Sequence, residues 1–399
     1  MKLTKFMCAA FAAAIALASC QKQDTPATPE KGEEQGKIIS VSLSNVQSIV
    51  KSKSLSTDVL SDFSDAEMPS AYVNNFQVFL SDGTNLYQGL NANGSKAPHY
   101  FTVENNSFNQ VFHYVVPAVN QVIVVANMGA EIKLEDVNTV EALLQSIVKI
   151  EDQQNVNNLV LYGIDTELTV VENAHSGESG AHQTKSNVHT AEVELAPLVA
   201  RIEVTDFTAM YSANNPYKSV TVDQIAFNDY FTEKQLNNTL GTTHVDKSTE
   251  QTDMAAFFTG LTGWAYDSNV GIQIANPNFA NGGAAINVTV PVPAAQDNDT
   301  QCYAYNFFPT SGTLGTENGY PQLVVGLTST DAQDRTAPQY LATKKFNIAG
   351  QGTFTGFQPG FVYEINFAFP DSALQNTLVC VDVAVTVKKW QVVALVPEF

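Results

Sequence analysis

The chain has 399 residues, of which 44% are hydrophobic, and this length exceeds what one hydrophobic core usually spans, so two domains are expected. Only 15% of the residues are charged, but 40 acidic against 20 basic residues give a formal net charge of −20. Such a surface repels phosphate groups, which argues against nucleic acid and anionic lipid headgroups as partners.

The first twenty residues have the pattern of an export signal that ends in a lipid-attachment cysteine. Two lysines precede an apolar run at 6–17, and Leu17-Ala-Ser-Cys20 puts a cysteine directly after a small-residue cleavage site. The apolar run is shorter than the about 20 residues needed to span a bilayer. We expect residues 1–19 to be removed and Cys20 to carry acyl chains that hold the precursor to a membrane.

The next segment predicts a tether and then a strand. Residues 20–36 contain no large apolar side chain and are expected to be flexible. Ile39, Val41 and Leu43 then alternate with serines, which predicts a strand with one buried face, within the segment 37–45.

The stretch 47–70 is rich in Ser and Asp and is expected to form mainly an exposed loop. Lys51 and Lys53 are the only basic residues between the first strand and the rest of its domain. Exposed polar loops are where proteases cut. Cleavage after either lysine would therefore separate the first strand from its domain.

The body of the chain is predicted to be mostly β, because short apolar segments are separated by Gly-, Asn- and Pro-rich turns. One amphipathic helix of about four turns is expected from Leu134 to Ile147, and a second, short one at 253–260. Strands are expected at 76–80, 122–126, 159–162, 168–171, 193–204, 220–227, 285–292, 323–327 and 361–369. This pattern predicts two β-sandwiches in series, at 37–192 and 193–377.

The last segment, 378–399, predicts two short strands. Valines occupy every second position at Val379, Val381, Val383, Val385 and Val387, and Trp390 and Val392 resume the alternation after a lysine pair. Pro397 ends it, because proline cannot donate to a ladder. Two interpretations stay open: the last hairpin of an ordinary domain, or a donor strand for a groove in a neighbouring molecule.

Several of these segments, in order along the whole chain, resemble the fimbrillin family, the lipoprotein-derived type V pilins of major and minor fimbriae. They are the lipid-attachment site, the strand at 39–43 with the basic site after it, Val122-Ile-Val-Val-Ala-Asn-Met-Gly129, Ala196-Pro-Leu-Val-Ala-Arg201-Ile-Glu-Val204, and the valine-rich tail. The resemblance implies two transthyretin-like β-sandwich domains, export to the outer membrane, removal of the first strand by a trypsin-like protease, and polymerisation by strand exchange into a surface fimbrium.

The implied partners are other copies of the chain, other pilus subunits, the protease, and host or bacterial adhesion targets. One feature departs from the family: its processing site typically follows arginine, whereas this chain offers Lys51 and Lys53. The stalk interpretation therefore has alternatives. They are an uncleaved anchor subunit, a tip subunit, and a monomeric glycan-binding surface lipoprotein.

Motifs for chemistry are weak, and neither an enzyme nor a cofactor is expected. His175, His182 and His189 recur every seven residues, but the glycines between them argue against a helix that would align them on a metal. Trp264 and Tyr266 could stack on a glycan, but aromatic residues in such a stretch are more often core or rim residues. Cys302 and Cys380 could form a disulfide after export, or lie in the core as small apolar side chains.

Overall fold

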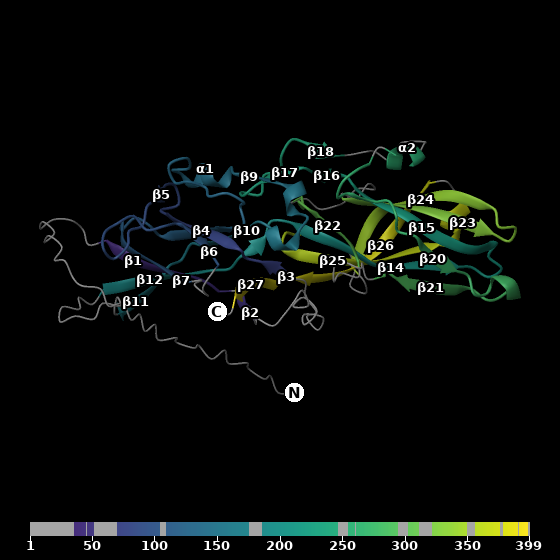
Figure 1. Ribbon diagram of the computed structural model, residues 1–399, viewed down its shortest axis with the longest axis horizontal. Helices are drawn as coiled ribbons and strands as arrows, with labels where there is room; N and C mark the ends of the chain where they lie inside the picture. Colours follow the sequence, from purple (N-terminus) through teal and green to yellow (C-terminus); the bar gives the residue numbers. More distant parts are fainter. Residues whose placement is uncertain are drawn as a thin grey trace, which may run out of the picture.

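The computed structural model describes residues 36–44, 46–51, 70–103, 109–174, 186–245, 254–259, 261–293, 302–310, 321–348, 356–375, 378–389 and 391–397. Figure 1 shows an elongated molecule, with the strands of the first half of the chain at one end and those of the second half at the other. The prediction of a mostly β fold with short helices is confirmed.

Two sheets make up most of the described first half. The β1 sheet has the order β11-β12-β1-β7, and the β8 sheet has the order β13-β10-β8-β4-β5, with β6 also paired to β4. The strands of the β1 sheet are β1 (Lys37–Leu43), β7 (Asn109–Val115), β11 (Thr169–Ala174) and β12 (Ser186–Val193). Those of the β8 sheet are β4 (Asn75–Ser81), β5 (Leu86–Tyr87), β6 (Tyr100–Thr102), β8 (Gln121–Ala126), β10 (Leu161–Asp165) and β13 (Ala196–Pro197).

One extended sheet, here called the long sheet, dominates the second half. Its order is β19-β15-β23-β24-β26-β25-β14-β21, with β20 also paired to β15 and β22 to β14. Its strands are β14 (Ala200–Tyr211), β15 (Tyr217–Asn228), β19 (Tyr266–Asp267), β20 (Ile272–Ala275), β21 (Ile286–Pro291), β22 (Tyr303–Phe307), β23 (Gln322–Asp331), β24 (Thr336–Ile348), β25 (Phe361–Pro370) and β26 (Leu378–Lys389).

Smaller elements complete the described part of the chain. β9 (Ile147–Lys149) pairs with β17 (Glu233–Gln235), β16 (Tyr230–Phe231) pairs with β18 (His244–Val245), and the tail sheet consists of β2 (Gln47–Lys51), β27 (Gln391–Pro397) and β3 (Ser70–Tyr72). The helical segments are α1 (Val140–Leu144), α2 (Met254–Thr259), η2 (Ile150–Gln153), η3 (Val156–Asn158), η4 (Phe279–Asn281) and η5 (Asp371–Gln375).

Each half has its own apolar core. The first lies between the β1 sheet and the β8 sheet, and the second is enclosed by the long sheet. The change from one core to the other falls between Val199 and Ala200. A few apolar side chains from later in the chain, Leu236, Phe308 and Val362, join the first core.

The predicted four-turn helix is wrong in its length. Thr139 is the N-cap, since its hydroxyl oxygen accepts from the backbone N–H of Ala142, so the helix begins only at Val140. The backbone N–H groups of Asp136 and Val137 instead donate to the carbonyl of Lys133 in a turn. Ile147 belongs to β9, and its backbone is extended because β9 pairs with β17. The second, short helix predicted at 253–260 is confirmed as α2.

The halves are joined by a seam of buried and half-buried polar groups. The Gln154 side chain bonds both backbone groups of Asn306: its Nε2 donates to the carbonyl at 2.9 Å, and its Oε1 accepts from the N–H at 3.1 Å. Arg201 donates to Oδ1 of Asn306 and, at 2.5 Å, to Glu203. Because buried polar groups are costly when unpaired, this network fixes the two halves against each other.

Lys234 also lies at this seam, on β17. Its side chain is 2% exposed, and Nζ donates to the carbonyl of Leu198 at 3.3 Å and lies 6.0 Å from the centre of the Phe308 ring. Burial disfavours the ammonium form and lowers the pKa of Lys234 to about 8. The folded chain therefore gives up this proton at a lower pH than the unfolded chain does.

We expect this difference to make the free energy of unfolding rise with pH. Between about pH 8 and the ordinary lysine value of 10.5, the unfolded state binds more protons at this site, which favours folding by up to about 2 kcal/mol from pH 7.5 to 9.5. In Lys234→Met this increment should be missing. Denaturant unfolding of both proteins across this range measures it, with Lys133→Met on an exposed side chain as the control. Parallel profiles for wild type and Lys234→Met would contradict the assignment.

Candidate assembly site

The first strand, β1, lies inside its sheet with a neighbour on each edge. It runs parallel to β12, with Val41 opposite Ala191 and Leu43 opposite Val193. On the other edge it runs antiparallel to β7, where Ile39 lies opposite Phe112. Withdrawal of β1 would therefore leave two strands with unpaired backbone N–H and C=O groups.

The inward face of β1 is part of the first core. Ile39, Val41 and Leu43 are 0%, 1% and 7% exposed, as their alternation with serine predicts. At about 1.5 to 3 kcal/mol for each buried side chain, they contribute roughly 5 to 9 kcal/mol of gross apolar burial. On the outward face, Ser42 is half-buried and its hydroxyl donates to the carbonyl of Ala191 at 3.3 Å.

Both ends of β1 are fixed as well. Nζ of Lys37 donates to the carbonyl of Val119, and the N–H of Ser44 donates to the carbonyl of Val193 at 3.0 Å. Gly36 packs on the backbone of Tyr114, where a Cβ would lie 2.6 Å from the Tyr114 Cα, so this position has room only for glycine. Tyr114 has a φ of 49°, a left-handed conformation at the irregularity where the register with β7 shifts.

The predicted processing region is partly structured, which corrects the expectation of a loop that begins at residue 47. Residues 47–51 form β2, which pairs in parallel with β27, and Lys51 is its last residue, opposite Pro397. Local sequence did not indicate this strand, because the strand that pairs with it, β27, comes much later in the chain. Lys53 and Cys20 lie outside the described residues, and their predicted roles stay predictions.

The valine-rich tail is divided between two places. β26 lies in the long sheet, parallel to β24 and antiparallel to β25, and Val385 is fully buried in the second core. β27 lies outside the long sheet, between β2 and β3. The sequence predicted two strands that end at Pro397. It left open whether the first of them pairs within its own domain, as β26 does here, or fills a groove in a neighbouring molecule.

The donor role of the tail stays a prediction. The side chains of Val379, Val381, Val383, Val387 and Val392, and the whole of Trp390, lie outside the described part of the chain. Strand exchange by 378–389 would require β26 to leave its own sheet and Val385 to leave the core. Strand exchange by β27 requires only that the tail sheet open.

Asn127 is a site residue that the sequence analysis missed. Its φ is 57°, and its Nδ2 donates to the carbonyls of Tyr72 and Leu159 at 2.6 and 2.9 Å, while Oδ1 accepts from the N–H of Asn74 at 2.9 Å. One side chain thus fixes the end of β3 to the β8 sheet. An Asn directly after a buried strand and two residues before Gly129 was the available signal, because Asn tolerates the left-handed region.

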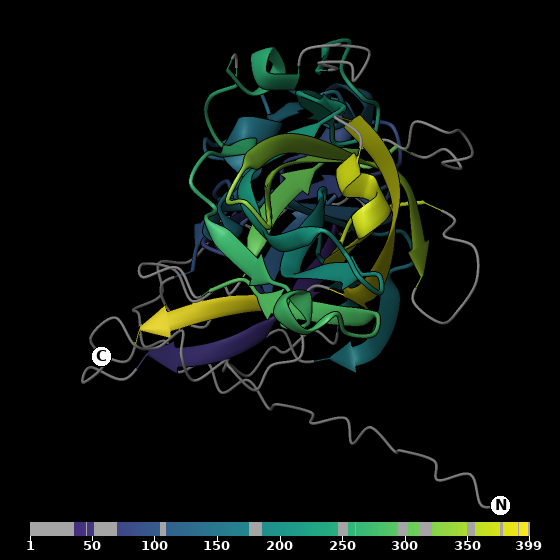
Figure 2. The ribbon, with the colours of Figure 1, turned by 90° about the vertical axis from the view of Figure 1, so that its right-hand side faces the viewer.

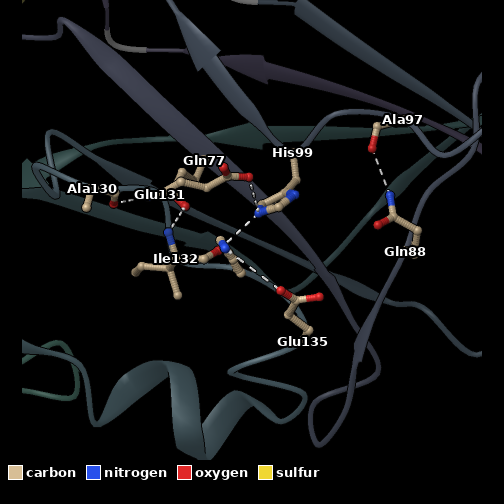
Figure 3. A network of polar contacts seen from close by, with 9 residues as sticks. Gln77, Gln88, Ala97, His99, Ala130, Glu131, Ile132 and Glu135 are labelled. Atoms are coloured by element: carbon tan, nitrogen blue, oxygen red, sulfur yellow. Dashed lines mark hydrogen bonds and ion pairs between the residues drawn. The ribbon is translucent and has the colours of Figure 1, made fainter.

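A second polar network secures the loop that follows β8, as Figure 3 shows. Oε1 of Gln77 accepts from the N–H of Ile132 at 2.7 Å, and Nε2 of His99 lies 3.0 Å from the Ile132 carbonyl and 3.4 Å from Glu131. Gln88 holds the carbonyl of Ala97 nearby at 2.8 Å. These contacts are structural. Among the described residues no group of three or more His, Cys, Asp or Glu side chains could hold a metal ion.

The remaining sequence candidates have structural contacts in the described part of the chain. Trp264 packs on Tyr230 and Phe227, with ring centres 4.9 and 6.0 Å apart, and the Tyr266 hydroxyl donates to Gln224 at 2.8 Å. Of the three spaced histidines, His189 is described on β12, and burial together with the Lys37 charge lowers its pKa. The side chain of Cys380 is not described, so its pairing with Cys302 stays untested.

No helix within the described residues has the length and apolar character needed to cross a membrane. No family model matches the chain, and no curated protein matches it.

Solved structures do match. The fold is similar to that of a candidate cell adhesion protein from Parabacteroides distasonis, with a TM-score of 0.50 at 12% identity over 89% of this chain and 96% of that one. A candidate cell adhesion protein from Bacteroides eggerthii has a TM-score of 0.48 at 17% identity, over 92% of this chain and 100% of that one. A fimbrilin, FimA, from Porphyromonas gingivalis has a TM-score of 0.44 at 12% identity, over 90% and 99%. At these identities the similarity concerns the fold alone.

The burial of Val385 leads to a prediction about the tail. Val385→Asp puts a carboxylate into the second core and should lower the free energy of unfolding by roughly 4 kcal/mol or more. Thr386→Asp, on the exposed neighbour in the same strand, should stay within about 0.5 kcal/mol of wild type. Thermal unfolding followed by circular dichroism compares the two variants. A Val385→Asp protein as stable as wild type would mean that β26 is not held in the core in solution.

Proposed function

We propose that this chain is a structural pilin of the fimbrillin type, a lipoprotein precursor that matures into the repeating stalk subunit of a cell-surface fimbrium. The observation that carries the proposal is the position of β1. This strand is the first of the described strands, is buried on one face and is paired on both edges, and only residues 44–46 connect it to β2. The resemblance of the sequence motifs and the similarity of the fold support the same role.

On this proposal the precursor is exported, anchored to the outer membrane through Cys20, and cut after Lys51 or Lys53. The cut separates β1 from the chain that follows, so β1 can leave. The groove between β7 and β12 then has two rows of unpaired backbone groups and an apolar floor that Ile39, Val41 and Leu43 filled. A strand from a neighbouring subunit refills it, with main-chain pairing for affinity and alternating side chains for specificity.

We propose β27 as the leading part of the donor. It lies outside the long sheet, and its alternating Val392, Ala394 and Val396 match in spacing the three apolar residues of β1. β26 keeps its place between β24 and β25 unless the long sheet opens. Because groove and donor are different surfaces of one subunit, the contact is heterologous and propagates as an open filament.

The anchor role is the second candidate, and one observation favours it. Lys51 lies within a paired strand, and a paired backbone is a poor protease substrate, since cleavage requires access to an extended, unpaired segment. An uncut chain would keep β1 in its groove, donate its tail and accept none. It would then lie at the base of the filament.

Two variants separate the donor from the acceptor role. A chain that ends after Trp390 lacks β27 but keeps β26, so after processing it should accept a strand and donate none. The Lys51→Gln, Lys53→Gln double variant should keep β1 in its groove and accept no strand. We expect each variant alone to stay monomeric, measured by light scattering and heat-resistant bands on gels. Dimers in an equimolar mixture would mean that an uncut chain donates its tail, as the anchor role requires.

The matched control is the wild-type chain, which should form long ladders after processing. Ladders from the chain that ends after Trp390 would show that β27 is not the donor. Filaments isolated from cells should contain repeating subunits whose N-terminal residue is Ser52 or Ser54. A blocked Cys20 on the repeating subunit would replace the stalk role by the anchor role.

A further inference from the structure

The tail sheet brings together three segments from distant parts of the chain. β27 is its middle strand and runs parallel to both neighbours, with Gln47 to Lys51 of β2 opposite Val393 to Pro397, and Ser70 to Tyr72 of β3 opposite Gln391 to Val393. In Figure 2 the strands β27 and β2 lie side by side at the edge of the molecule, apart from the long sheet.

The two neighbours of β27 cover different parts of it. Within the part of the chain that the structure describes, β3 pairs with 391–393, whereas residues 394–397 have a cross-strand partner in β2 alone. β3 is attached firmly to the body: Ala71 and Tyr72 are 0% and 5% exposed, and Asn127 holds the Tyr72 carbonyl. β2 is an edge strand of this sheet, and its register fixes the outer part of the tail.

β2 and β1 would be released together by cleavage. Both strands precede the peptide bond after Lys51, so a cut at this bond puts them on the same fragment. We propose that β2 is a retaining strand for the C-terminal strand of its own chain, and that one cut frees both the groove and the strand that fills it. This inference rests on the proposed function and adds a control step to it.

The consequence is that the uncut precursor is inert at both ends. Its groove is filled by β1, and its tail is occupied by β2 as long as the two are covalently linked to the body. After the cut and the loss of the fragment, residues 394–397 have no cross-strand partner among the remaining described residues of their own chain. The same cut therefore leaves the backbone of this part of the tail unpaired and opens a groove elsewhere on the same subunit.

A cross-link between β2 and β27 tests the pairing. Ser48 and Ala394 are partners in the register, and neighbouring strands lie about 5 Å apart, within the Cα separation that a disulfide accepts. The full-length chain with Ser48→Cys and Ala394→Cys should form this disulfide under mild oxidation, as measured by peptide mapping. The control pair, Ser48→Cys with Val396→Cys, is two residues out of register and should yield at least ten-fold less.

The same variant tests the consequence. After cleavage behind Lys51, the cross-linked protein should form no ladders, and reduction should restore them to the level of cleaved wild type. Failure of both cysteine pairs to cross-link, or equal yields from both, would overturn the retaining role of β2, whatever the subunit does in a filament. Ladders that form before reduction would instead show that the tail need not be freed, which contradicts both the control step and the donor role of β27.

Discussion

The double pairing of the first strand is the constraint on which the rest of the structure depends. A strand with ladders on both edges and a buried face is normally the least removable part of a sandwich, because its loss exposes backbone groups and apolar surface together. Here that strand is also the first of the described strands, and it is joined to the rest of the chain through β2. Under the proposed mechanism, β1 can be removed without loss of the fold only if another strand with the same alternation of apolar residues takes its place.

The sequence predicted the local features of this arrangement well. Alternation identified β1 through Ile39, Val41 and Leu43, and the valine run with Pro397 identified the bounds of the tail strands. Both signals depend only on the two-residue period of a strand. The long helix was overestimated for a related reason: Leu134 and Val137 have helical spacing, but the cap at Thr139 and a turn around Lys133 decide where the helix begins.

What the sequence could not predict was pairing between distant segments. Gln47 to Lys51 is too polar and too short to stand out as a strand, and it becomes one because β27 lies beside it. Asn127 acts through the carbonyls of Tyr72 and Leu159, which no motif connects to it. The seam around Asn306 depends in the same way on side chains from both halves of the chain. Each of these needs the fold before its partners can be named.

The continuity of β26 with β27 has a mechanical meaning. Only Trp390 separates the strand held between β24 and β25 from the strand at the free end of the tail. A force applied to the tail acts along the axis of β26, so the hydrogen bonds on both of its edges are loaded together in shear and do not open one after another. In the filament proposed above, tension between neighbouring subunits would thus pass into the centre of the long sheet, where Val385 is buried.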